Sequence, residues 1–178
     1  MEAVWNANAE EGSFSLVRRF NYHNELGAQF PISSLRVVYA KAGTQPTACI
    51  VRDQGAIIEN LLYWTTPASE QEGSYLAAIL NSETTRFRAE HFQARGQWGA
   101  RHFDKVMFNL PIPRFDAAQP LHADLAAAAA EAEALAAAVA LPEGVKFQRA
   151  RKLVRDALAD AGLSARIDGL VARLLDGP

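Results

Sequence analysis

The sequence predicts an α/β fold of the α+β kind: a small, mostly antiparallel sheet with packed helices, followed by a helical C-terminal tail. Two observations favour it. Short β-branched and aromatic runs separated by turn residues crowd between Leu35 and Thr66, and alanine- and leucine-rich stretches fill the last third of the chain. With 178 residues, 49% hydrophobic and 21% charged, the composition is globular, which argues against wholesale disorder.

The strands are expected in one block. Residues 1–33 show little periodicity and could be the severed end of a preceding domain. Three strand-like runs follow at 35–41, 47–52 and 56–66, separated by Ala-Gly-Thr-Gln-Pro and Asp-Gln-Gly turns. They predict an antiparallel meander. The single cysteine, Cys49, lies between Ala48 and Ile50, so we expect a small buried hydrophobe without a disulfide.

Helices are expected after this block. Tyr75, Leu76, Ile79 and Leu80 share one face of a helix, and Ser82 can cap a second helix that ends near His91. The run at 103–110 alternates as a short strand does, and Pro111 and Pro113 prevent its continuation in a ladder.

The composition changes after Asp116. Residues 121–141 predict an alanine-rich helix, 145–161 predict a second helix with a basic face, and a third starts near Ser164 after the break at Gly162. The expected organisation is an N-terminal segment (1–33), an α/β domain (34–116) and a tail of about three helices (117–178).

Enzyme signatures are absent from the sequence. There is no glycine-rich phosphate loop and no Gly-x-Ser-x-Gly elbow, and the four histidines are scattered without a metal-ligand spacing. We therefore expect no catalytic residue, no metal and no cofactor in this chain. Its start does not resemble a secretory signal, and no apolar stretch approaches the ~20 residues that span a membrane, so a cytoplasmic protein is expected.

The segment 93–105, QARGQWGARHFDK, is the best candidate for binding. Between Arg86 and Lys105 five cationic residues stand against two acidic ones, a local excess in a chain whose net charge is -2. Cations bind phosphates, planar donors and acceptors read base edges, and an indole can stack. The candidate DNA-binding residues here are Arg95, Gln97, Trp98, Arg101, His102 and Lys105, joined by Lys41 and Gln45 of the first hairpin. A solvated loop with Trp98 folded into the core is the competing interpretation.

The order of these motifs carries a family resemblance. Leu-Ala-Ala-Ile-Leu-Asn-Ser (76–82), then the basic loop, then Asn-Leu-Pro-Ile-Pro (109–113) resembles the C-terminal target-recognition domain (Taq-type specificity domain) of adenine-specific DNA methyltransferases from restriction–modification systems. The likeness covers about residues 35–116. It implies that Leu76, Ile79 and Leu80 pack, that Asn81 and Ser82 cap, and that Pro111 and Pro113 fix the exit of the strand.

The resemblance implies a function for the chain. Neither the Asn-Pro-Pro-aromatic motif for the flipped adenine nor a Gly-x-Gly turn for S-adenosylmethionine is present, so cofactor and chemistry would belong to the parent methyltransferase. The expected partners are duplex DNA and a methyltransferase catalytic domain or subunit, and no membrane. The alternative is a helical protein–protein interaction module of a restriction–modification complex. A weaker third possibility is a nuclease that uses Asp53 and Glu59.

Overall fold

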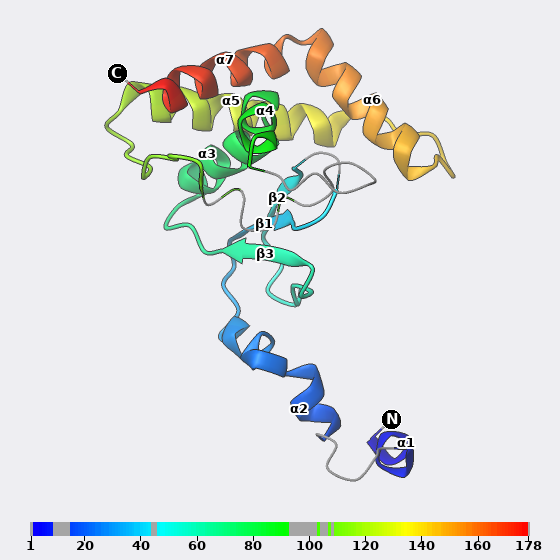
Figure 1. The fold of residues 1–178 in the computed structure, drawn as a ribbon. Helices are drawn as coiled ribbons and strands as arrows, with labels where there is room; N and C mark the ends of the chain where they lie inside the picture. Colours follow the sequence, from blue (N-terminus) through cyan, green and yellow to red (C-terminus); the bar gives the residue numbers. More distant parts are fainter. Residues whose placement is uncertain are drawn as a thin grey trace.

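The α+β architecture expected from the sequence is confirmed. The computed structural model describes residues 2–8, 15–43, 46–92, 103, 107 and 109–177. Figure 1 shows a small sheet at one side of the body, helix α3 above it, and helices α5 and α7 above α3. The N-terminal helices lie away from this body.

The sheet has three antiparallel strands: β1 (Arg36–Ala40), β2 (Ala48–Val51) and β3 (Leu62–Thr65). The strand order is β2-β1-β3, so β1 is central and the expected meander is wrong in its order. β1 pairs Val38 with Cys49 on one side and with Trp64 on the other. β1 is almost wholly buried, as its apolar sequence requires, while both edge strands are partly exposed.

Two local expectations differ from the structure. Cys49 is exposed, because it lies on an edge strand whose alternation turns its side chain away from the core. Within the expected strand 103–110, Met107 and Asn109 belong to a 3₁₀ turn, and residues 104–106 and 108 lie outside the described residues. The alternating pattern there reflects anchoring of single apolar side chains, since Phe103, Met107 and Leu110 are all buried.

Helix α3 (Glu70–Asn81) joins the sheet to the helices. The Ser69 side chain caps its first turn by accepting from Glu72 N. At its other end Asn81 Oδ1 accepts from Ala48 N (2.9 Å) and Asn81 Nδ2 donates to Ala48 O (3.0 Å), which ties the helix to β2. Ser82 then caps α4 (Glu83–Glu90) through Thr85 N, as expected from the sequence.

The described residues 117–177 contain three helices: α5 (Pro120–Ala138), α6 (Phe147–Asp160) and α7 (Leu163–Asp176). Gly162 adopts φ 71°, the left-handed conformation that glycine tolerates best, between α6 and α7. α5 and α7 pack on α3, and their buried residues form one cluster with Tyr75, Ala78 and Ile79, which we call the helical core.

A second cluster, the sheet core, lies below α3. It contains Val37 and Tyr39 of β1 together with Leu80, Ala89, Phe103, Met107 and Leu110. Leu76 and Ile112 pack against both clusters. The sheet, α3 and the C-terminal helices therefore form layers that share apolar side chains.

The N-terminal part consists of α1 (Glu2–Asn8), α2 (Leu16–Phe20) and two 3₁₀ turns, η1 (Tyr22–Asn24) and η2 (Gly27–Gln29). Its link to the body is the buried Gln29, whose amide exchanges two hydrogen bonds with the main chain of Ile58 (2.8 and 2.9 Å). Figure 1 shows α1 and α2 beyond this link, away from the sheet.

Candidate nucleic-acid interface

The main candidate segment lies mostly outside the described residues. Arg95, Gln97, Trp98, Arg101, His102, Lys105 and also Gln45 are outside them, so their roles stay predictions. The structure describes the chain just before the segment and at Phe103 within it. α4 ends at Glu90, and buried Phe103 donates its N–H to Lys41 O (2.8 Å) at the end of β1.

Lys41 is the one candidate residue that the structure describes. Its ammonium group donates to Asn60 O and lies over the Tyr63 ring, 4.4 Å from the centroid. Both partners are uncharged, so neither contact is an ion pair that would neutralise the ammonium group at the root of the first hairpin. The contacts hold the side chain against the sheet, where it can contribute positive potential to an adjacent anion.

Two arginines of the expected basic patch are neutralised. Arg86 pairs with Glu83 (2.7 Å) and, more loosely, with Glu90 (3.9 Å). Arg88 pairs with Asp176 and donates to Leu175 O (3.0 Å). Both arginines therefore stabilise α4 and its packing. The count of local charges in the sequence did not show this.

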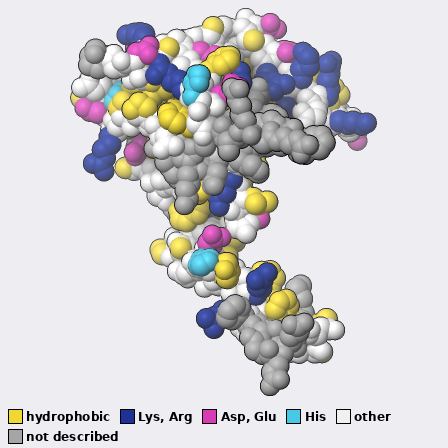
Figure 2. Space-filling view, viewed as in Figure 1, with side chains coloured by type: hydrophobic (Ala, Val, Ile, Leu, Met, Phe, Trp, Pro, Cys, Tyr) yellow, Lys and Arg dark blue, Asp and Glu magenta, His cyan; other side chains and the backbone are white. Residues whose placement is uncertain are grey.

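The described cations gather on α6 instead. Figure 2 shows Lys and Arg side chains along this helix. We define the α6 basic face as Lys146, Arg149, Arg151, Lys152 and Arg155. Lys146, Arg149, Lys152 and Arg155 are exposed, and Lys152 pairs with Asp156 (2.6 Å). Among the described residues, Lys146 and Arg149 have no acidic partner within ion-pair distance. The opposite, apolar side of α6 is half-buried against α5 and α7.

One contact joins the α6 basic face to the first hairpin. Arg151 Nη2 donates to Thr47 Oγ1 (3.3 Å), and its guanidinium lies 5.5 Å from the Phe147 ring centroid. Thr47 directly precedes β2, whose hairpin with β1 begins at Lys41. Residues separated by about a hundred positions in the sequence thus share one surface, on which Lys146 and Arg149 are exposed cations. The sequence showed the charges of α6 but not their position beside the hairpin.

The carboxylates proposed for a nuclease site have structural roles in the described residues. Asp53 Oδ1 accepts from Gly55 N (2.7 Å) and Glu59 Oε2 from Leu61 N (2.9 Å), so both proposed nuclease carboxylates stabilise their own turns. Within the described ranges, no three His, Cys, Asp or Glu side chains gather as metal ligands would. No helix in this part of the chain is long and apolar enough to cross a bilayer, α5 included.

Comparison with known proteins gives no relative: no family model, no curated protein and no solved structure matches this chain.

Proposed function

We propose that this protein is the DNA target-recognition module of a restriction–modification methyltransferase. It binds duplex DNA sequence-specifically and presents it to a catalytic domain or subunit outside this chain. The observation that supports this is the Arg151–Thr47 contact, which brings the α6 basic face beside the hairpin that carries Lys41 and Gln45. Such a role places the protein in the cytoplasm, where the DNA is.

The two parts of the surface would divide the work. Phosphate contacts position a protein on DNA, and base contacts supply the specificity. The α6 basic face is suited to phosphates, since its exposed cations are spaced along one helix. Arg95, Gln97 and Trp98 have the chemistry to read bases. The adenine would be flipped and S-adenosylmethionine consumed in the catalytic domain.

A paired charge-removal experiment tests the interface. Lys146→Ala with Arg149→Ala removes two exposed cations of the α6 basic face, and Arg18→Ala with Arg19→Ala removes two from α2, far from α6 in Figure 1. Binding to labelled random duplexes is followed by fluorescence anisotropy from about 50 to 200 mM salt. We expect the α6 variant to bind more weakly and to lose about 2 units of the log–log salt slope, with the α2 variant unchanged.

Three outcomes test the proposal: binding at low salt, the change in salt slope, and the enrichment of a sequence motif. Absence of binding by the unaltered protein at low salt would refute a DNA-binding function. Equal slopes for the parent and the α6 variant would remove α6 from the interface. Sequencing of the bound duplexes tests specificity: enrichment of a short motif, lost in Arg95→Ala with Arg101→Ala, would assign the reading of bases to the 93–105 segment.

The second candidate is the protein–protein interaction module. It is favoured by apolar residues that remain on the surface around α6, where Phe147 is 70% exposed and Leu141 48% exposed. This candidate predicts that the protein captures the separately expressed methyltransferase subunit with an affinity that does not depend on salt. Loss of that capture in Leu141→Ser with Phe147→Ser, with DNA binding unaffected, would favour this candidate.

A further inference from the structure

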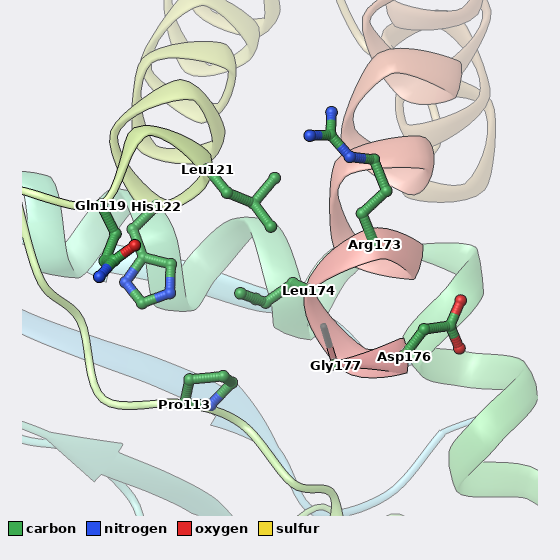
Figure 3. A pocket seen from close by; sticks show the side chains of 8 residues that line it. All are labelled: Pro113, Gln119, Leu121, His122, Arg173, Leu174, Asp176 and Gly177. Carbon is green, nitrogen blue, oxygen red and sulfur yellow. The ribbon is translucent and has the colours of Figure 1, made fainter.

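A pocket lies on the side of the helical layer where the N-terminus of α5 meets the C-terminus of α7. It has a volume of about 560 Å³, within the range of small-molecule sites. Figure 3 shows its lining: Pro113, Gln119, Leu121, His122, Arg173, Leu174, Asp176 and Gly177. Leu121, Leu174 and Pro113 supply apolar walls from three separate segments, and Gln119, His122, Arg173 and Asp176 supply polar side chains.

His122 is the central polar group. Its side chain is only 8% exposed, between the rings of Tyr75 (5.0 Å between centroids) and Phe115 (6.2 Å). Its Nδ1 accepts the N–H of Asp116 (3.0 Å). A backbone N–H can only donate, so Nδ1 carries no proton and the proton of the neutral ring is on Nε2. Figure 3 shows the ring edge that bears Nε2 turned towards Leu174 and the pocket.

This Nε2–H has no hydrogen-bond acceptor among the described residues, although nine-tenths of the residue is buried. The ring is buried, but the Nε2 atom faces the open pocket, where solvent reaches it, and a bound acceptor would take the place of that water. The feature that points to a ligand is therefore a donor at the wall of a cavity, held in one direction by its buried ring and by the Asp116 hydrogen bond.

The groups around His122 Nε2 favour an acceptor that carries a negative charge. α5 begins here, its N-cap Gln119 makes no side-chain cap bond, and Pro120 has no N–H to offer. His122 N and Ala123 N both donate to Gln119 O, which leaves Leu121 N–H as the further donor of the first turn. Arg173 adds a positive charge. The only acid in the lining, Asp176, is already paired with Arg88.

We propose that this pocket binds a small carboxylate with a compact apolar or aromatic body. The carboxylate accepts from His122 Nε2–H close to the α5 N-terminus, and the body contacts Leu121, Leu174 and Pro113. The site is separate from the α6 basic face, and it assigns a ligand-binding role to residues that the DNA-recognition proposal does not use.

The test compares sodium benzoate with benzamide, a neutral molecule of the same shape. Each is titrated into the ¹⁵N-labelled full chain and followed by amide chemical shifts. We expect saturable shifts at Leu121, His122 and Gly177, with benzoate binding at a Kd around 1 mM or below and benzamide about tenfold more weakly. Equal binding of the two, or shifts confined to other residues, would overturn the proposal.

Two variants give the matched controls. In His122→Asn the carboxamide oxygen can still accept Asp116 N–H, but no donor reaches the place of Nε2, so benzoate affinity should fall about tenfold. Unchanged affinity would refute the role of His122. Arg173→Gln, at an exposed position, changes charge without removing core packing. It should weaken benzoate and leave benzamide unchanged, and an equal effect on both would overturn the carboxylate assignment even if His122→Asn did not fold.

Discussion

Tyr75 shows how one side chain joins three segments of this protein. It is fully buried, packs on Phe115 and His122, and donates its hydroxyl to Pro113 O (2.9 Å). The Pro-Ile-Pro stretch is thereby fastened to α3 and α5. Burial raises the pKa of Tyr75 to about 12, because the phenolate would lose its hydration.

Removal of the Tyr75 hydroxyl measures what its hydrogen bond contributes to stability. Tyr75→Phe keeps the ring and loses one hydrogen bond, so the free energy of unfolding should fall by about 1 kcal/mol at pH 7. The folded chain retains a proton that the unfolded chain releases near its ordinary pKa of 10, so this part of the stability is complete below pH 10 and is lost as pH rises towards 12. Urea titrations at pH 7 and across that window should show the alkaline loss in the parent and a smaller loss in Tyr75→Phe.

Arg52 links the sheet to two helices through carboxylates. Its guanidinium contacts Glu70 of α3 (2.9 Å) and Glu133 of α5 (2.6 Å). The hydrogen bond from Arg52 lowers the pKa of Glu133 below its ordinary value. A lowered carboxyl pKa means that the contribution is present above the unfolded pKa and is lost as pH falls.

Glu133→Gln tests this ion pair. Both side chains are nearly half exposed, so solvent screening limits the expected loss to about 0.5–1 kcal/mol at pH 7 and low salt. The difference from the parent should shrink as pH falls below the ordinary value of about 4.5 and vanish only below the lowered pKa of the folded state, where the carboxylate is protonated in both states. Glu143→Gln, an exposed residue between α5 and α6, is the control in the same thermal-melt series. A pH-independent difference would exclude the ion pair as its cause.

At the scale of elements, α7 holds α4 in place. Asp168 Oδ1 accepts from Glu83 N (2.8 Å) at the start of α4, and Thr84 Oγ1 donates to Asp168 O (3.2 Å). Near the other end of α4, Arg88 donates to Leu175 O. Since α4 leads directly into the 93–102 segment, α7 determines where that segment begins.

Asp168→Ala should therefore affect both stability and the proposed DNA binding. It removes an acceptor for a helix N-terminus, which costs about 1 kcal/mol. Asp160→Ala, at the exposed end of α6, removes the same charge and should leave stability within ±0.5 kcal/mol. Chemical denaturation of the two variants gives the comparison. Equal stability would mean that Ser82 alone suffices to begin α4.

The sequence predicted the elements better than their arrangement. The periodic helices and three strands were found because their patterns are local, as in the spacing of Tyr75, Ile79 and Leu80. The central place of β1 was missed, since strand order depends on partners that each run does not reveal. Sequence patterns also did not reveal that Arg36 is buried and that its Nη2 donates to Asp53 O and Ala56 O. Nor did they reveal that its Nε and Nη1 have no hydrogen-bond partner.

The candidate site was predictable to a similar extent. Basic residues of α6 could be counted in the sequence, but only the fold brings Arg151 to Thr47. His122 was one of four scattered histidines, and its orientation results from Asp116, Tyr75 and Phe115 together. These contacts depend on tertiary packing, which local sequence patterns do not reveal.

At the scale of the whole molecule, α3 is shared between two apolar clusters. Its Tyr75, Ala78 and Ile79 belong to the helical core, and its Leu80 belongs to the sheet core. Leu76 and Ile112 contact both. Helices from residues 117–178 therefore bury one face of α3. We expect the sheet and these helices to unfold together in one cooperative transition.

Leu125→Ala tests this expectation. Leu125 is fully buried in α5, so truncation should lower the free energy of unfolding by about 2–5 kcal/mol. The sheet is reported by Trp64 fluorescence, with Trp5 and Trp98 replaced by Phe, and the helices by circular dichroism. If the cores are coupled through α3, both signals shift to the same lower denaturant concentration. If residues 117–178 instead form an independent tail, the helical signal moves and the Trp64 transition stays, because a cavity in one unit leaves the stability of a separate unit unchanged.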